Sequence, residues 1–245
     1  MSTTDPALSA PTPAPGRSPV RLDAELDPGL SRGMWLVKWL LAIPHVIVLF
    51  FLWIAFGVTT VIAGVAILFT GRYPRSLFDF NLGVLRWSWR VSYYASSGGL
   101  GTDRYPPFSL GEHPEYPARL SIAYPGPLSR GLVLVKWWLL AIPHYLVLAA
   151  LFGAASGTDR SATAAPGLLT VLTLVAGVVL LFTRRYPRSL FDLIVGFNRW
   201  QYRVFAYVFL MTDQYPPFRL DQGGPEPAAD TVAPAGPLPA APQPA

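Results

Sequence analysis

Two histidines in this sequence stand where an ionisable side chain could do chemistry. His45 and His144 each follow the proline of the tetrapeptide AIPH, and each lies in a long apolar run. An ionisable group inside a membrane segment is a candidate for proton relay or metal binding. Two ligands are too few for a typical metal site, however, and no Cys, Asp or Glu adjoins either ring. The sequence therefore predicts no metal and no cofactor, with backbone carbonyls freed at a proline kink as simpler partners.

Four arginines recur at helical spacing after the apolar runs. They follow an acidic residue and a glycine at i, i+4, i+7 and i+11, once as Asp79, Gly83, Arg86 and Arg90 and again as Asp192, Gly196, Arg199 and Arg203. This spacing gives one helix face, and aromatic residues flank it. Arginine at mid-bilayer costs about 2.5–3.5 kcal/mol, so the pattern favours an amphipathic helix in the membrane interface. These arginines are candidates for binding lipid phosphates or another anion; snorkelling, or pairing with the acids of their own helix, is the alternative.

The two aspartates of this pattern have a structural explanation. Asp79 and Asp192 follow Ser76 and Ser189 in the spacing Ser-x-x-Asp, which is a helix start signal: the serine caps backbone N–H groups and the acid suits the positive helix end. Paired catalytic carboxylates are the competing interpretation. No glycine-rich phosphate loop and no hydrolase or metalloprotease motif is present. The sequence therefore predicts a protein that is not an enzyme.

The elements that must position these residues form two copies of one unit. LVKW, AIPH, YPRSLFD, RW and TD-x-YPPF occur in the same order twice, with YPRSLFD repeated 113 positions apart. We assign repeat 1 to residues 19–110 and repeat 2 to 118–220, with a linker at 111–117. The proline-rich ends, 1–18 and 221–245, are predicted to be disordered.

Each unit begins with an apolar stretch too long for one straight crossing. Residues 34–69 would form a helix of about 54 Å, whereas the hydrocarbon core is about 30 Å thick. Repeat 2 carries a polar insertion, 153–167, inside the corresponding stretch. We therefore expect transmembrane helical hairpins at 34–70 and 132–183, each followed by an interfacial helix, at 76–97 and 189–211. Two alternatives stay open: a re-entrant hairpin, or one tilted helix that starts at Pro44.

Composition and charge placement support a membrane protein. Of the 245 residues 52% are hydrophobic and only 13% are charged, with no cysteine, whereas soluble domains carry about 25% charged residues. In the hairpin model nearly all basic residues fall on one side, which predicts parallel repeats and both termini in the cytoplasm. The expected interface anchors are Arg72, Tyr73, Arg75, Arg185, Tyr186 and Arg188.

Short alternating stretches at 20–26 and 118–124 predict β-strands. The PPFSL and PPFRL segments could pair with them in a small cytoplasmic cap. The predicted fold class is thus a mainly α integral membrane protein of two tandem repeats with short β-strands.

These motifs resemble a known family. The string from AIPH through LFTGRYPRSLFDFNLGVLRWSWR to TDRYPPF is similar to the domain-of-unknown-function 4389 family, bacterial membrane proteins that are common in actinobacteria. The resemblance covers nearly everything between the tails, once per repeat. Repeat 2 departs from it: Asn81 has no counterpart, and Gln214 replaces Arg104. The resemblance implies residence in the bacterial plasma membrane and the repeat itself, and it brings no catalytic residues.

The function expected from the sequence is a non-catalytic membrane module acting as a scaffold, an accessory subunit or a lipid-organising protein. A small oligomeric transporter or channel is the first alternative and a membrane-embedded enzyme the second. We expect membrane lipids, mainly anionic, as partners, and a homo-oligomer or partner membrane protein stays open. Nucleic acid is not expected.

Overall fold

The computed structural model describes residues 18–152, 167–183 and 185–221. The predicted disordered tails, apart from Ser18 and Asp221, and the polar insertion, apart from Gly167, lie outside these residues.

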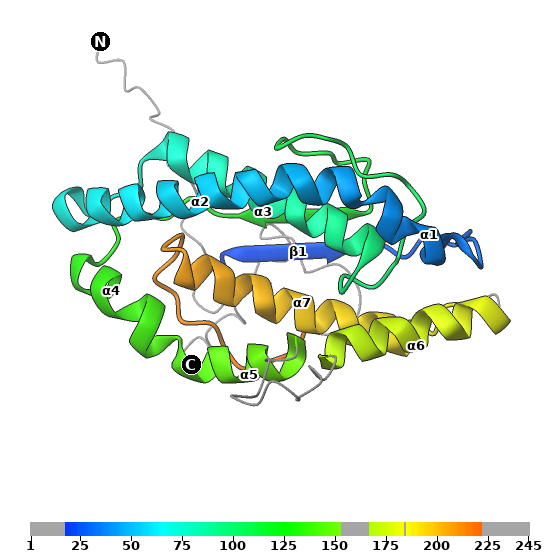
Figure 1. The fold of residues 1–245 in the computed structure, drawn as a ribbon. Coiled ribbons are helices and arrows are strands. Elements are labelled where there is room, and N and C mark those ends of the chain that lie inside the picture. Colours follow the sequence, from blue (N-terminus) through cyan, green and yellow to red (C-terminus); the bar gives the residue numbers. More distant parts are fainter. Residues whose placement is uncertain (1–17, 153–166, 184, 222–245) are drawn as a thin grey trace, which may run out of the picture.

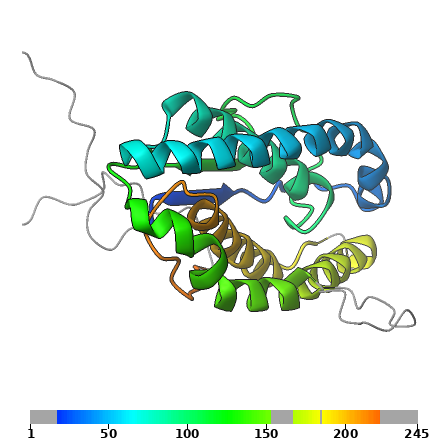
Figure 2. The same cartoon turned by 60° about the vertical axis from the view of Figure 1, so that its left-hand side comes forward.

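The described chain forms three layers, seen together in Figures 1 and 2. The outer layer holds α1 and α2 on one side and α4, η1, α5 and α6 on the other. The helices α3 and α7 form the middle layer. They pack on a two-stranded sheet, α3 against β2 and α7 against β1. The elements are β1 (Val20–Ala24), α1 (Met34–Leu41), α2 (Ile43–Thr70), α3 (Arg75–Ala95), β2 (Ala118–Ile122), α4 (Arg130–Val135), η1 (Lys136–Leu140), α5 (Ile142–Phe152), α6 (Leu168–Thr183) and α7 (Arg188–Val208).

The apolar stretch of repeat 1 is not a hairpin. Helix α2 runs unbroken for 28 residues, about 42 Å, through the middle of the hairpin predicted at 34–70. The break falls earlier, at Ala42, and Pro44 lies in the first turn of α2, where its missing N–H costs nothing. The helix ends at Gly71, whose left-handed conformation (φ 71°) suits glycine. The alternative of one long helix starting near Pro44 is therefore the observed one.

Repeat 2 follows the same course. Helices α5 and α6 lie end to end along one side of the molecule and do not fold back on each other (Figures 1 and 2). They match the two halves of α2, so the predicted hairpin at 132–183 is also wrong. A polar insertion does not by itself require the chain to reverse.

The two repeats run in opposite directions. The strands β1 and β2 pair antiparallel, with Leu22 opposite Leu120. The end of α2 meets the start of the repeat 2 helices, where the Leu128 N–H donates to the Gly71 carbonyl at 2.8 Å. The YPR turns therefore lie at opposite ends of the molecule (Figure 1). The predicted parallel repeats, with all basic clusters on one side, are not observed.

A π-helical turn absorbs a one-residue insertion. LVKW recurs at an offset of 98 but AIPH at 99, because repeat 2 has a second tryptophan, Trp138. The structure accommodates the extra residue in η1, where the wider turn takes up one more residue. Lys136 and His144 thus keep the places that Lys38 and His45 hold in repeat 1.

The predicted interfacial helices form, but in the middle of the protein. The prediction of 76–97 and 189–211 matches α3 and α7 within a few residues. Both helices are nearly covered, and Trp89 and Val204 are fully buried. Their amphipathic pattern therefore reflects apolar packing on one face and contact with the sheet on the other.

The sheet forms as a contact between repeats. The strands predicted at 20–26 and 118–124 are confirmed, but they pair with each other and not with PPFSL or PPFRL. A two-stranded sheet leaves one edge of each strand without a strand partner, and buried carbonyls there need donors. Arg86 Nε donates to the Leu120 carbonyl at 3.0 Å, and Arg199 Nε donates to the Leu22 carbonyl at 2.9 Å. Each repeat thus holds the strand of the other.

Two glycines in helix interiors test this packing. Nothing lies within 4 Å of a Cβ added at Gly57 in α2, whereas at Gly83 in α3 that atom meets Leu110 Cβ at 2.7 Å and the Leu110 carbonyl at 3.0 Å. We expect Gly57→Ala to stabilise the protein by about 0.5–1 kcal/mol and Gly83→Ala to destabilise it by about 1–3 kcal/mol. Thermal unfolding in detergent measures both. Destabilisation by Gly57→Ala would contradict the unbroken α2.

Candidate functional site

The repeated motifs of each unit converge on one buried lysine. In repeat 1, Lys38 is 1% exposed. Its Nζ donates to the Thr102 carbonyl at 2.6 Å and forms an ion pair with Asp103 at 2.8 Å. Asp103 also accepts the Ser31 N–H at 2.6 Å. The repeated segment LSRG, at residues 30–33 and again at 128–131, therefore meets LVKW and TDRYPPF at one polar centre. We call residues 102–108 the first strap and residues 212–218 the second strap.

Repeat 2 builds the same centre. Lys136 is fully buried and donates to the Thr212 carbonyl at 2.9 Å and to Asp213 at 2.8 Å. The Ser129 N–H donates to Asp213 at 2.6 Å. Both lysines lie over a tyrosine ring at 5.3 Å, Tyr94 in repeat 1 and Tyr207 in repeat 2. Burial disfavours ionisation of Asp103, but the hydrogen bonds from Lys38 and Ser31 and the lysine charge outweigh it and hold the pKa of Asp103 below its ordinary value.

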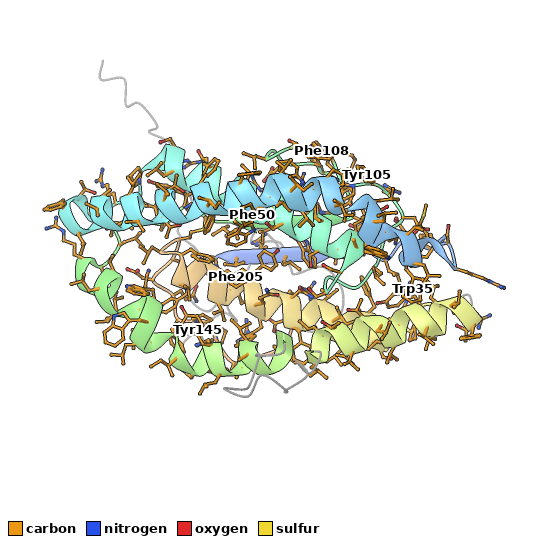
Figure 3. All side chains as sticks on the ribbon, viewed as in Figure 1. Trp35, Phe50, Tyr105, Phe108, Tyr145 and Phe205 are labelled. Atoms are coloured by element: carbon orange, nitrogen blue, oxygen red, sulfur yellow. The ribbon has the colours of Figure 1, made fainter. Side chains whose placement is uncertain are left out.

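The two histidines lie in separate aromatic enclosures, each covered by the strap of its own repeat. His45 is fully buried, accepts Trp87 Nε1–H at 3.1 Å and stacks on Phe108 with centroids 3.9 Å apart. His144 stacks on Phe218 at 4.4 Å and contacts the Pro216 carbonyl at 3.2 Å. Figure 3 shows Tyr105 and Phe108 beside the N-terminal half of α2. Within the described residues no three His, Cys, Asp or Glu side chains gather to hold a metal ion.

These enclosures leave the outer helices without exposed charge beyond Arg130, the first residue of α4. Between residues 34 and 70 the sequence has only two charged or titratable side chains, Lys38 and His45, and both are buried. In α4 to α5 beyond Arg130 the corresponding pair, Lys136 and His144, is buried as well, and Tyr145 is half-exposed. The straps thus convert the outer helices into uninterrupted apolar surfaces.

The four candidate arginines bind the protein itself. Arg86 also pairs with Glu112, and Arg199 donates to the Asp221 carbonyl at 2.7 Å. Arg203 forms an ion pair with the Asp221 carboxylate. Arg90 donates to two carbonyls, Ser109 and Gly111. The predicted role in binding lipid at a membrane surface therefore does not suit Arg199 and Arg203, which are buried among these partners.

The predicted caps and two of the predicted anchors differ from expectation. Helices α3 and α7 begin after the N-cap residues Pro74 and Pro187, which have no side-chain acceptor and therefore form no side-chain cap. The first helical hydrogen bonds run from Phe78 N–H and Phe191 N–H to the two proline carbonyls. Ser76 and Ser189 therefore lie within the first turn. Asp79 pairs with Arg75 at 3.2 Å, and no cap forms at Asp192. Tyr73 is buried, and the Tyr186 hydroxyl donates to the Gly99 carbonyl. The other anchors, Arg72, Arg75, Arg185 and Arg188, are exposed.

One cleft lined by charged side chains opens beside the sheet, between residues of repeat 1, the linker and β2. Its volume is about 240 Å³, and arginines from β1, α3 and β2 line it. Arg90 is one of the residues that line it. Burial, together with the charge of Arg86, lowers the pKa of Arg90 to about 10. Its guanidinium is still charged at neutral pH. A second, apolar cavity of about 400 Å³ lies between α1 and α6 beside Trp35 (Figure 3).

Sequence analysis did not find the lysine centres. It counted Lys38 and Lys136 among the basic residues expected on one side of the membrane. Each repeat, however, has an aspartate at the matching place, Asp103 for Lys38 and Asp213 for Lys136. The recurrence of Lys-Trp and Thr-Asp in both copies was the available signal. A buried lysine needs a carboxylate, and the strap offers one at the same place each time.

Comparison with known families gives one match. The model described as a domain of unknown function, DUF4389, matches residues 32–109 and 162–219, which together make up more than half of the chain and fall one in each repeat. No curated protein and no solved structure matches.

The Lys38–Asp103 pair makes a direct prediction. Asp103→Asn leaves a buried ammonium without its counter-charge, so we expect a loss of about 3–5 kcal/mol of unfolding free energy. The double variant Lys38→Met, Asp103→Asn should recover most of it. Because the pKa of Asp103 is depressed in the folded state, its contribution is complete above the unfolded pKa of about 3.9 and is lost as pH falls through the folded value.

Denaturant unfolding of both variants between pH 3 and pH 7 measures this. The difference in unfolding free energy between the wild type and Asp103→Asn should become smaller only below about pH 4. The exposed Asp79→Asn, whose pair with Arg75 lies at the surface, is the matched control and should cost less than about 1 kcal/mol. Equal losses at Asp79 and Asp103 would contradict the buried centre.

Proposed function

The chain belongs to the domain-of-unknown-function 4389 family, and we propose that it is a non-catalytic membrane module that organises lipids or a partner membrane protein. The family description assigns no activity, so the proposal rests on the surface of the outer helices. In this proposal α1, α2 and α4 to α6 insert their apolar faces into the bilayer, and the sheet layer stays in water.

The observation that carries the proposal is the exposure of α2. Twelve of its large apolar side chains are exposed, and the core helix of a soluble protein would bury them. Helix α2 and residues 130–149 are long and apolar enough to cross a membrane. Figure 3 shows carbon-rich side chains projecting from α2, α5 and α6. The exposed set on α2 is Ile43, Val46, Ile47, Val48, Phe50, Phe51, Ile54, Val58, Val61, Ile62, Val65 and Phe69.

The position of the sheet layer favours a flat arrangement, in which the outer helices lie along one leaflet of the bilayer. The strands run beside the outer helices, separated from them by α3 and α7 (Figures 1 and 2). If α2 crossed the bilayer along its length, the charged residues of the sheet layer, such as Arg21 and Arg119, would reach hydrocarbon depth, where each costs several kcal/mol. If the outer layer lies in the interface, those charges face water and the pseudo-two-fold axis follows the membrane normal. The multi-pass form with cytoplasmic termini expected from the sequence is the competing outcome.

A small transporter remains the second candidate because the repeats run in opposite directions. Inverted repeats that cross the bilayer are a recurrent transporter design. The polar groups available in α2 are weak support for a pathway, since Thr59 and Thr60 already bond to Asn81. We rank the flat module first for this reason.

Charge placed on the outer face tests the proposal. The double variant Phe51→Asp, Val61→Asp should lower partitioning into phosphatidylglycerol and phosphatidylcholine vesicles at least tenfold, because each added carboxylate opposes insertion. Both side chains are more than 60% exposed, so the fold should survive, as circular dichroism would show. Flotation of vesicles measures the bound fraction.

The matched control places the same two charges in the exposed loop after β2, as Ala123→Asp, Gly126→Asp. This control should partition as the wild type does. Equal flotation of the two double variants, or a wild type that stays monomeric in water without detergent, would refute membrane insertion through α2.

A further inference from the structure

We propose that the arginine-lined cleft beside Arg90 is a binding site for a phosphate group, carried by either a lipid headgroup or a soluble phosphate ester. The site is new relative to the membrane role and does not depend on it, because the cleft lies on the sheet layer.

The cleft concentrates positive charge. Four arginines line its volume of about 240 Å³ and only two acids do. Arg21 has no hydrogen-bond or ion-pair partner within the described chain, while Arg119 pairs with the exposed Glu25. Such a net positive, concave surface favours an anion. The charged residues of the lining are Arg21, Asp23, Arg86, Arg90, Glu112 and Arg119.

Arg90 is the buried centre of this charge. The residue is 2% exposed, and its two terminal nitrogens donate to the Ser109 and Gly111 carbonyls. Its Nε has no hydrogen-bond partner, and the same holds for Nε2 of His113, another residue of the lining. Among the described residues no carboxylate forms an ion pair with Arg90. The charge of Glu115 acts on Arg90 without an ion pair, so the hydrogen bonds of this buried guanidinium go only to neutral carbonyls and leave it short of direct counter-charge.

Repeat 2 shows what is missing. The equivalent of Arg90 is Arg203, and the Asp221 carboxylate pairs with it. When the two straps are aligned, Gly111 and Asp221 fall at the same position, three residues after each strap ends. Asp221 therefore supplies internally the negative charge that repeat 1 lacks. The space beside Gly111 is open, since a Cβ there meets only the Ser109 hydroxyl, at 3.3 Å.

The chemistry of the lining favours phosphate. Guanidinium groups bind phosphate oxygens through paired N–H donors, and several converge on this cleft. An external phosphate would occupy the place of the Asp221 carboxylate and would satisfy Arg90 from the open side.

The experiment restores the missing carboxylate. Gly111→Asp copies repeat 2 and should abolish phosphate binding, whereas Gly126→Asp adds the same charge in an exposed loop and should leave binding unchanged. Arg21→Ala removes a lining arginine without a partner and should weaken binding about tenfold. Detergent-purified full-length protein is titrated with glycerol 1-phosphate by calorimetry, and lipid retained by the purified protein is identified by native mass spectrometry.

Each result decides the matter. Saturable binding of glycerol 1-phosphate that Gly111→Asp removes identifies a soluble phosphate ester. Retained phosphatidylglycerol on the wild type and Gly126→Asp, but not on Gly111→Asp, identifies a lipid headgroup. If neither ligand binds, or if Gly111→Asp and Gly126→Asp bind equally, the proposal is wrong. Thermal unfolding of Gly111→Asp at wild-type temperature or above confirms that it folds. Vesicle flotation of the same variants is expected to be unchanged, which separates this site from the membrane role.

Discussion

The buried lysine of each repeat is the constraint on which the rest of the structure depends. An ammonium inside an apolar helix is tolerated only where a carboxylate and carbonyls meet it. Lys38 finds both on the first strap, and Lys136 finds them on the second. Reaching the lysine lays the strap along the outer helix, where its aromatic residues then enclose the histidine. The break at Ala42 and the π turn at η1 keep lysine and histidine on the same strap. One ion pair thus organises four sequence motifs and clears charge from the outer surface.

A second set of contacts holds the repeats to each other. The strand of each repeat lies against the middle helix of the other repeat, β2 against α3 and β1 against α7. An arginine of each helix, Arg86 in α3 and Arg199 in α7, donates to a carbonyl of the strand that it covers. Neither repeat could keep its strand buried alone, since a lone strand has no hydrogen-bond partner.

The two repeats differ from each other at single positions near the straps. Arg104 pairs with Asp27 at 3.7 Å in repeat 1, and repeat 2 has lost both charges, with Gln214 and Pro125 at those places. A further difference is Gly111 against Asp221, at the cleft.

Local patterns predicted the elements well and their placement poorly. Repeat order, the two strands and the helices at α3 and α7 follow from periodicity and from Pro and Gly signals. The hairpins did not, because the length of the apolar stretch was compared with the thickness of a bilayer, whereas α2 is one unbroken helix that packs along α3. In the sequence Arg86 and Arg199 resemble residues of a membrane interface, yet each donates a hydrogen bond to a strand carbonyl of the other repeat. That long-range pairing leaves no local trace. The lysine centre could have been predicted, since Lys38 and Asp103 recur together as Lys136 and Asp213.

The most direct test of this account is the side from which the two ends of the molecule can be labelled. The chain has no cysteine, so single cysteines at Ser76, Ser189 and Val58 can be probed in cells and inverted vesicles with a membrane-impermeant maleimide. Ser76 and Ser189 are exposed in the first turns of α3 and α7, which begin at opposite ends of the molecule (Figure 1). Val58 lies mid-way along α2. The flat module predicts labelling of both serine positions from the same side and of Val58 from neither. Labelling of Ser76 and Ser189 from opposite sides would contradict it and establish crossing, inverted repeats, whereas labelling of Val58 from the far side would restore the hairpin.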